Sequence, residues 1–348
     1  MQQRDTERNG CSTIGRRRFL ATTGAAVAGT AGLAGCLGND GDGLTIYSGR
    51  SEDQIEPIFR EVEEQLDVAI EDRYGDSAGM VGQIVEEGED SPADLFYTQD
   101  SGTLGQLKEA GRTAELPDDV LETVPESYRD PDGTWTGVSG RTRSVAYNTD
   151  EWEAEDLPDD IFEYAEDDRF EDELGWRTDS GSFLSFIRAM MIEYGEDETR
   201  EWIEGLQELG INGYEGGSTT PQAVADGEIS VGLVNHYYVG RLIEDEEDAP
   251  INVTFTDGDV GSLFNVSGVA PVDTADDLDL AQEFVEAVLS EEIQELFVEL
   301  NAEYAVIEDV EYVGDLPQLD ELNPPTFDLN DLADVEPAQD LLRDTGVL

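Results

Sequence analysis

Two adjacent tyrosines and the only histidine of the chain follow a run of apolar residues. Residues 234–238 read Val-Asn-His-Tyr-Tyr, and the run at 229–234 has the composition of a buried strand. In open α/β sheets, ligands bind beyond the carboxyl ends of the strands. Tyr237 and Tyr238 could present two hard phenolate oxygens to a hard cation such as ferric iron, which can remove the proton of a tyrosine. Taken alone, such a pair is more often packing or a belt over a sugar ring, and His236 is more often structural.

A second group with binding chemistry is the sequence Asp179-Ser180-Gly181-Ser182, which stands at the start of a predicted helix. The hydroxyls and the free backbone N–H groups of a helix start bind anions. The alternative is that Ser180 is an ordinary helix N-cap.

Charged and polar side chains also stand beside the ends of other predicted strands. Arg50 follows the first strand, and Arg141 and Arg143 precede another. Three arginines in such places are notable in a chain with only 19 basic residues, although each could be a surface ion partner. Gln99 and Asp100 follow a further strand, and Asp100 is either a metal ligand or a turn residue.

An enzyme is not indicated. The chain has no GxGxxG, Walker A or HExxH pattern. It offers no arrangement of nucleophile and base, because Cys11 and Cys36 lie in or next to the leader and His236 lies beside the tyrosine pair.

The candidate residues are positioned by alternating strands and helices. This alternation predicts a mostly parallel sheet with helices on both faces. Ser51 and Gln54 match a capping box at the start of the first helix. Met190 and Met191, on the helix that begins at Ser180, are predicted to fill the core. Strands are expected at 44–47, 68–70, 94–97, 144–147 and 229–234, and helices at 51–66, 78–87, 102–110, from 180, 280–289 and 291–300.

The charge is extreme for a chain that must fold. The 348 residues include 83 acidic and 19 basic ones, a formal net charge of −64, yet 38% are hydrophobic, which is enough for a core. Spread acidic residues are typical of a surface adapted to very high salt, where self-repulsion is screened. Nothing resembles a basic patch, so nucleic acid is not expected as a partner.

The N-terminus has the features of an export signal. Arg16, Arg17 and Arg18 precede an apolar stretch at 21–34 that is too short for a comfortable membrane span. It ends in Leu-Ala-Gly-Cys36, which matches a lipobox, so cleavage before Cys36 and lipidation of its sulfur are expected. We therefore predict a twin-arginine lipoprotein signal at 1–35 and an anchor with a flexible tether at 36–43. The alternative is an ordinary signal peptide that happens to contain a cysteine.

The chain from residue 44 to 348 resembles the ferric-ion-binding proteins of ABC iron importers, relatives of the transferrin-type lobe, with the leader of a haloarchaeal-type lipoprotein. Asn-His-Tyr-Tyr at 235–238 is the most specific element. The resemblance is also carried by 46–50 (Ile-Tyr-Ser-Gly-Arg), 86–94, 98–100 (Thr-Gln-Asp), 137–143 (Gly-Val-Ser-Gly-Arg-Thr-Arg), 180–183 (Ser-Gly-Ser-Phe), 227–228, 231–234, 302–304 and 341–343.

The resemblance implies an α/β fold of the type II periplasmic-binding-protein kind, with two α/β lobes joined by a two-strand hinge. Lobe 1 would span 44–142 and 270–318, and lobe 2 would span 143–269 and 319–348. It implies a monomeric binding protein, not an enzyme. Held by lipid at the outer face of the cytoplasmic membrane, it would deliver its cargo to an ABC permease with its ATPase.

The resemblance also implies a ligand set. Tyr237 and Tyr238 would bind Fe(III) as cargo, and a synergistic carbonate or phosphate would complete the coordination. The anion would be held by Ser180, Gly181, Ser182 and Asn235 and balanced by Arg50 and Arg141.

The sequence departs from the family at several ligand positions. Ser51 stands where some members have a histidine, Gln99 where some have a glutamate, and Gly217 where some have an asparagine that contacts phosphate. A carbonate site, or one that adds Tyr74, Asp100, Gln99 or water, therefore fits better than the site of His, Glu and phosphate.

A different cargo is the main alternative. In a binding protein for a small organic anion or phosphonate, Ser180 and the arginines would bind the ligand, and Tyr237 would only stack on it.

Overall fold

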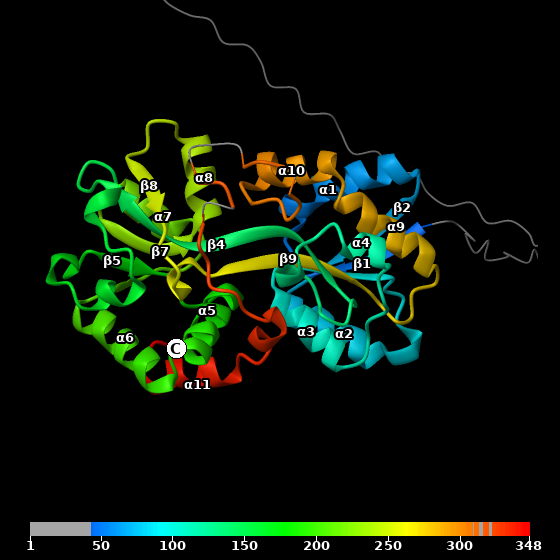
Figure 1. Cartoon of the computed structure of the whole chain (residues 1–348), viewed down its shortest axis with the longest axis horizontal. Helices are drawn as coiled ribbons and strands as arrows, with labels where there is room; N and C mark the ends of the chain where they lie inside the picture. Colours follow the sequence, from blue (N-terminus) through cyan, green and yellow to red (C-terminus); the bar gives the residue numbers. More distant parts are fainter. Residues whose placement is uncertain (1–42, 309, 313–315, 320–321) are drawn as a thin grey trace, which may run out of the picture. The chain divides into compact units, whose positions relative to one another are not determined.

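The computed structural model describes residues 43–308, 310–312, 316–319 and 322–348 (Figure 1). The predicted leader, Cys36 and the tether up to residue 42 lie outside the described residues. Within the described ranges, no helix is both long enough and apolar enough to cross a membrane.

One sheet is built by the first strands of the chain together with two later ones. β1 lies between β2 and β3 and is parallel to both. β9 joins β3 in the antiparallel direction, and β4 joins β9. The connecting helices cover the sheet because each has an apolar face, as in α1, where Ile55, Ile58 and Phe59 are buried. The bounds are β1 Gly43–Ser48, α1 Glu52–Leu66, β2 Ala69–Tyr74, α2 Ser77–Glu87, β3 Leu95–Thr98, α3 Ser101–Glu109, α4 Asp118–Leu121, β4 Thr136–Asn148 and β9 Phe264–Pro271.

The second sheet continues from the distal half of β4. There β4 pairs with β7 and β8, and β5 lies between β7 and β6. Every residue of β7 is buried, as expected for the apolar run that precedes the tyrosine pair. The bounds are β5 Leu174–Trp176, α5 Gly181–Glu193, α6 Glu196–Glu208, β6 Asn212–Gly213, α7 Thr219–Ala225, β7 Val231–Asn235, α8 His236–Asp245 and β8 Ile251–Thr254.

β4 and β9 connect the two sheets. The strand order is β2-β1-β3-β9-β4-β7-β5-β6, with β8 on β4. Figure 1 shows β4 in green and β9 in yellow running side by side through the middle of the described part. All 13 residues of β4 are buried, so its side chains contribute to the interior of both sheets.

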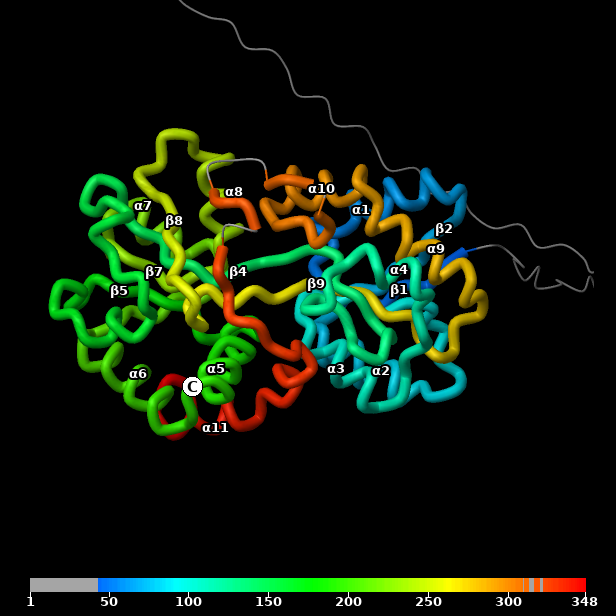
Figure 2. The backbone as a smooth tube through the Cα atoms, in the orientation of Figure 1, coloured from blue at the N-terminus to red at the C-terminus, as the bar shows by residue number. Residues whose placement is uncertain are grey.

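The last helices return to earlier parts of the chain. In Figure 2, α9 (Leu278–Val288) and α10 (Glu291–Asn301) lie beside α1, and α11 (Glu336–Asp344) lies beside α5. The two predicted late helices are thereby confirmed, with bounds shifted by a residue or two.

Two predictions about local structure were wrong. The sheet is mixed, not mostly parallel, because four of the eight strand pairings among the described residues are antiparallel. Spacing along the sequence does not show that β9 runs back between β3 and β4. The capping box at Ser51 is also absent. The Ser51 side chain makes no cap hydrogen bond, and the backbone N–H of Gln54 donates instead to the Ser51 carbonyl oxygen at 3.1 Å.

Other local predictions were confirmed. Ser180 caps α5, because its Oγ accepts a hydrogen bond from the N–H of Phe183 at 3.2 Å. Met190 is buried in the core, and Met191 packs against it from a partly buried position.

Candidate functional site

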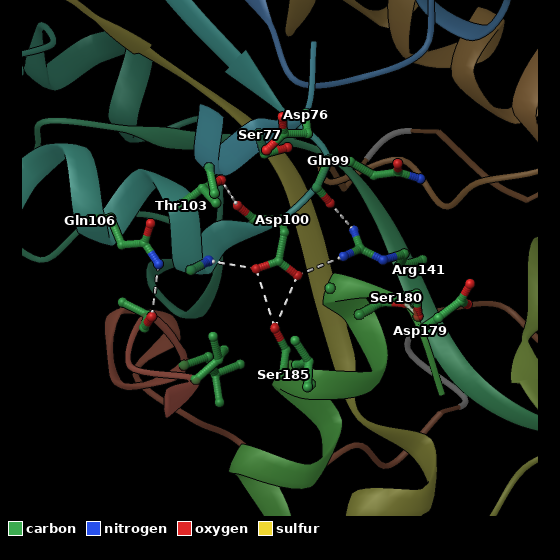
Figure 3. A pocket seen from close by; sticks show the side chains of 18 of the residues that line it. Asp76, Ser77, Gln99, Asp100, Thr103, Gln106, Arg141, Asp179, Ser180 and Ser185 are labelled. Carbon is green, nitrogen blue, oxygen red and sulfur yellow. Dashed lines mark hydrogen bonds and ion pairs between the residues drawn. The ribbon is translucent and has the colours of Figure 1, made fainter. Parts of the chain in front are cut away.

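A cavity of about 420 Å³ brings most of the predicted site residues together. It is bounded by the start of α3, the crossing strand β4, the start of α5 and the first turn of α8, with residues of the 332–339 segment on a further side. Figure 3 shows Gln99, Asp100, Arg141, Ser180 and Ser185 facing this space. The predicted residues that line it are Gln99, Asp100, Arg141, Ser180, Gly181, Ser182, Tyr237 and Tyr238.

The tyrosine pair is positioned by the junction of β7 and α8. Tyr237 and Tyr238 lie in the first turn of α8, beyond the carboxyl end of a fully buried strand. Their ring centroids are 4.2 Å apart. Tyr237 is 2% exposed, whereas Tyr238 is half-buried. Gly217 makes room for the second ring, since a Cβ at that position would lie 1.9 Å from Cζ of Tyr238.

The Tyr237 hydroxyl lies among groups that act on its ionisation in opposite directions. Burial raises the pKa of Tyr237, the neighbouring Tyr238 raises it further, and Arg141 lowers it. Gln99 Nε2 donates to the Tyr237 hydroxyl at 3.4 Å. The phenol is therefore neutral at ordinary pH, and its phenolate would need a bound cation as a partner.

Arginines surround the tyrosine pair. The guanidinium of Arg241 lies 5.0 Å from the centroid of the Tyr237 ring, and Arg177 Nη1 donates to the Tyr238 hydroxyl at 3.4 Å. Arg50 and Arg143 interact electrostatically with Tyr237. With Arg141, these make five of the 19 basic residues of a chain whose net charge is −64. Three of these five arginines are ion-paired, with Asp100, Asp179 and Glu303.

Asp100 connects three parts of the fold. Its side chain caps α3 by accepting from the N–H of Gly102 at 2.9 Å. Oδ2 accepts from Arg141 Nη2 at 3.0 Å and from Asn265 Nδ2 at 3.1 Å, and Ser185 Oγ on α5 donates to it at 3.2 Å. Figure 3 shows this convergence. The carboxylate is engaged on both oxygens, so binding a metal would require it to give up part of this network.

The start of α5 offers polar groups for an anion. Ser182 Oγ accepts from Asn235 Nδ2 at 3.3 Å, and Ser180 Oγ lies 3.2 Å from Ser182 Oγ. The first N–H groups of a helix have no partner within the helix. Asn235, which is buried, contacts this cluster through Ser182 and does not line the 420 Å³ cavity.

Besides Asn235, two predicted residues do not line the cavity. Arg50 is 1% exposed and forms a bidentate ion pair with Glu303, at 2.8 and 2.9 Å. Tyr74 donates its hydroxyl to Asp72 at 2.6 Å at the end of β2. The lipidation prediction for Cys36 lies outside the described residues.

Some residues of the site were missed by the sequence reasoning. Arg177 lines the cavity next to Ser180 and is held by Asp179, whose Oδ1 accepts from its Nε at 2.6 Å. Arginines are rare in this chain, so an arginine two residues before Asp179 could have been recognised as a candidate site residue. Ser185 gave none, because its contact with Asp100 joins residues that are 85 positions apart.

The described residues contain no group of three or more histidine, cysteine, aspartate or glutamate side chains that could hold a metal ion. A metal site in this part of the chain would therefore have to use other donors, and two phenol oxygens in one helical turn are such donors.

The chain matches a family of solute-binding proteins and is similar to proteins named for iron binding or iron uptake. The sequence pattern of a family described as bacterial extracellular solute-binding protein matches residues 90–329. The chain is similar to the major ferric iron-binding protein of Neisseria meningitidis, with 28% identity over 312 residues, covering 87% of this chain and 93% of the relative. It is also similar to iron uptake protein A1 of Synechocystis, with 29% identity over 301 residues, covering 81% and 83%.

A solved structure supports the same relationship. Iron-bound HitA from Pseudomonas aeruginosa superposes with a TM-score of 0.80 at 30% identity, covering 87% of this chain and 99% of that one. The predicted fold class, two α/β lobes joined by two strands, is confirmed by this likeness and by the two sheets that β4 and β9 connect. The residue bounds of the lobes stay a prediction.

Proposed function

Because the chain belongs to the bacterial extracellular solute-binding protein family, we propose that it binds Fe(III), together with a synergistic anion, in the cavity beside Tyr237 and Tyr238. It is a binding protein that would pass its cargo to an ABC permease and the permease's ATPase. The observation that carries the proposal is the tyrosine pair itself: two phenols from one helical turn, at a strand end, with Arg141, Arg177 and Arg241 beside them.

The arginines support the need for an anion. Fe(III) with two phenolates keeps one positive charge, and the arginines around the pair are only partly neutralised by Asp100, Asp179 and Glu303. A dianion such as carbonate or phosphate would offset this charge. Arg141 and Arg177 line the cavity and Arg50 does not, so we assign the balancing role to Arg141 and Arg177, with the start of α5 holding the anion oxygens.

The departures from the family leave room for further ligands. Gln99 already contacts the Tyr237 hydroxyl and lines the cavity, so its amide oxygen could turn toward a metal bound by Tyr237. Asp100 could join only by releasing Ser185 or Arg141. Tyr74 is the least favoured, because its hydroxyl is bound to Asp72 outside the cavity.

The proposed location follows from the leader. Export by the twin-arginine route and lipidation of Cys36 would hold the protein at the outer face of the cytoplasmic membrane. The acidic surface would suit a medium of very high salt, and we propose that the protein acts as a monomer.

A second cargo class is favoured by the number of arginines. A small organic anion or phosphonate would bind to Arg141, Arg177 and the start of α5, with Tyr237 stacking on it. Such a ligand would not depend on the phenol oxygens.

The experiment is an optical titration of residues 37–348 with chelated Fe(III), in multimolar salt with bicarbonate. We expect a visible phenolate-to-iron charge-transfer band that is lost in the Tyr237→Phe/Tyr238→Phe variant. Tyr74→Phe is the matched control, and it should keep the band because Tyr74 does not line the cavity.

A folded protein with no band and no saturable iron uptake would overturn the proposal. Calorimetric binding of an oxyanion or phosphonate that survives in Tyr237→Phe/Tyr238→Phe would then favour the second cargo class.

A further inference from the structure

A segment near the C-terminus joins two walls of the cavity. Residues 329–335, which we call the strap, begin with the helical turn η7 (Leu329–Leu332) and end where α11 starts. The strap contacts α3, which follows β3 of the first sheet, and α11 packs on α5, which follows β5 of the second (Figure 2). Leu332, Ala333 and Val335 line the cavity, so the strap is itself part of the cavity wall.

The strap lies against α3 at two glycines. A Cβ on Gly102 would lie 2.9 Å from the Leu332 carbonyl oxygen, and a Cβ on Gly105 would lie 3.1 Å from Cβ of Ala333. The strap backbone therefore approaches the helix backbone, and few side-chain atoms interlock at this point. Such a contact is close but shallow, because dispersion attraction grows with the number of atoms that touch.

Hydrogen bonds complete the contact of the strap with this side of the cavity. Gln106 Nε2 on α3 donates to the Ala333 carbonyl oxygen at 3.0 Å, as Figure 3 shows. The indole N–H of Trp135 donates to Asn330 Oδ1 at 3.1 Å, and Asn330 Nδ2 donates to Asp130 Oδ1 at 3.3 Å. Bonds of this kind can be exchanged for bonds to water at a small net cost.

The C-terminal end of the strap is held by the second sheet's helices. In α11, which packs on α5, Ala338, Leu341 and Leu342 are at most 2% exposed. Gln207 on α6 donates to the Thr345 carbonyl oxygen at 3.1 Å, just after α11, and η7 itself also contacts α5. Buried leucine side chains stabilise such packing, and water cannot replace them. When α3 and α5 move apart, the strap therefore leaves α3 and stays with α11.

The strap links α3 and α5 in addition to the crossing strands. We infer that it is a latch of the cavity: its contact with α3 keeps the cavity closed, and its release from α3 opens the cavity to solvent. Bending at β4 and β9 alone would not separate α3 from α5 while the strap holds both. The inference concerns the cavity whatever it binds, and it is tested without iron.

The test follows two side chains in metal-free residues 37–348, which include the compact unit from residue 42 onward and contain no cysteine. Hydrogen exchange of the Trp135 indole N–H, read by NMR, reports release of the strap, because that group donates to it. Nitration of Tyr237 by tetranitromethane, mapped by mass spectrometry, reports opening of the cavity, which Tyr237 lines. Trp202 and Tyr164 are the internal references, since both are buried and neither lines the cavity.

Gly105→Val should loosen the strap, because the new side chain would press on Ala333 while valine is no worse than glycine inside a helix. We expect Trp135 exchange and Tyr237 nitration to rise together by about tenfold, a size of effect typical of overpacking a fitted contact. Gly82→Val on α2 is the matched control. A Cβ there meets no atom within 4 Å, so both rates should stay at their wild-type values.

A disulfide makes the opposite change, and it tests the inference even where Gly105→Val does not fold. The Cβ atoms of residues 105 and 333 would lie 3.1 Å apart. This is slightly less than the roughly 3.5–4.5 Å of a disulfide, so Gly105→Cys/Ala333→Cys requires only a small shift. After oxidation we expect Tyr237 nitration to be lost and Trp135 exchange to fall by about tenfold or more, as for a blocked local opening. A reducing agent should restore both rates.

Parallel changes of the two rates would support the inference. Tyr237 nitration that keeps the wild-type rate while Trp135 exchange changes would overturn it, because the strap would then move without opening the cavity. An oxidised disulfide that leaves Tyr237 nitration unaltered would also overturn it, because the cavity would then open by another movement.

Discussion

Arg50 and Glu303 lie 253 positions apart in the sequence and form a fully buried ion pair in the fold. Ser139 Oγ on β4 donates to Glu303 at 2.8 Å, and Arg50 donates to Ser267 Oγ on β9 at 3.1 Å. The pair therefore fixes both crossing strands at their shared centre. Burial alone would raise the pKa of Glu303, but Arg50 overrides it and holds that pKa below its ordinary value.

Glu303→Gln should strongly destabilise the protein, because it leaves the Arg50 charge buried without its partner. We expect a loss of about 3–5 kcal/mol in the free energy of unfolding by urea. The exposed Glu299→Gln, on the same stretch of chain, is the control and should change that energy by less than about 0.5 kcal/mol. Equal effects of the two substitutions would contradict this role of the pair.

The pH dependence of the same pair has a definite sign. A carboxylate whose pKa is lower in the folded protein than in the unfolded chain stabilises the fold above the unfolded value, about 4.3. That contribution disappears as the pH falls through the folded pKa. Stability of the wild type should therefore fall more steeply in acid than that of an Arg50→Met/Glu303→Leu variant.

At the scale of residues, Tyr237 and Asp100 lie beyond strand ends as predicted, whereas Arg141, predicted to precede a strand, lies inside β4. Tyr237, Asp100 and Arg141 converge because the carboxyl ends of strands and the crossing strand meet at one place. The sequence did not show that Arg50 and Tyr74 are bound to other side chains and do not line the cavity. Glu303 is distant in sequence, and Asp72 is one acidic residue among 83.

At the scale of elements, the contact between Gly217 and α8 sets the position of the second phenol. The loop before α7 passes so close to α8 that a Cβ on Gly217 would lie 1.9 Å from Cζ and 2.2 Å from the hydroxyl oxygen of Tyr238. The ring of Tyr238 fills the space that a larger side chain at position 217 would need.

Gly217→Ala should weaken iron binding while the fold survives, because the flexible tyrosine ring yields before the backbone does. We expect Fe(III) affinity to fall about 10- to 100-fold, as for other changes next to metal ligands, with a weaker charge-transfer band. Gly213→Ala is the matched control, since a Cβ there meets no atom within 4 Å. An unchanged band in Gly217→Ala would show that Tyr238 is not a ligand.

The elements themselves were largely readable from periodicity. The helices α1, α5, α9 and α10 follow the spacing of their apolar residues, and β7 follows its apolar run. Strand direction was not readable, because pairing partners such as β3 and β9 are far apart in the chain and either direction buries the same side chains. The start of β4 was predicted at residue 144 and lies at residue 136, because the first half of the strand pairs only with β9, which is far away in the chain.

At the scale of the whole molecule, the net charge of −64 causes self-repulsion that dissolved salt screens. We expect the unfolding temperature of residues 37–348, followed by circular dichroism, to fall by more than about 10 °C between 3 M and 0.1 M KCl, where the Debye length grows from below 3 Å to about 10 Å. Sucrose at 0.1 M KCl should not restore it, because a neutral osmolyte does not screen charge. Equal stability at both salt concentrations would refute the proposed adaptation to high salt.

The place of β9 in the sheet has a consequence for how the protein is made. β9 lies between β3 and β4, although it is synthesised long after both. Until the ribosome has released residues 264–271, the facing edges of β3 and β4 have no partner and could pair with another chain. The nascent polypeptide therefore cannot complete its first sheet before β9 has been synthesised. Chaperone protection should be needed late in translation, and premature stop codons before residue 264 should yield aggregating fragments in place of a stable half-protein.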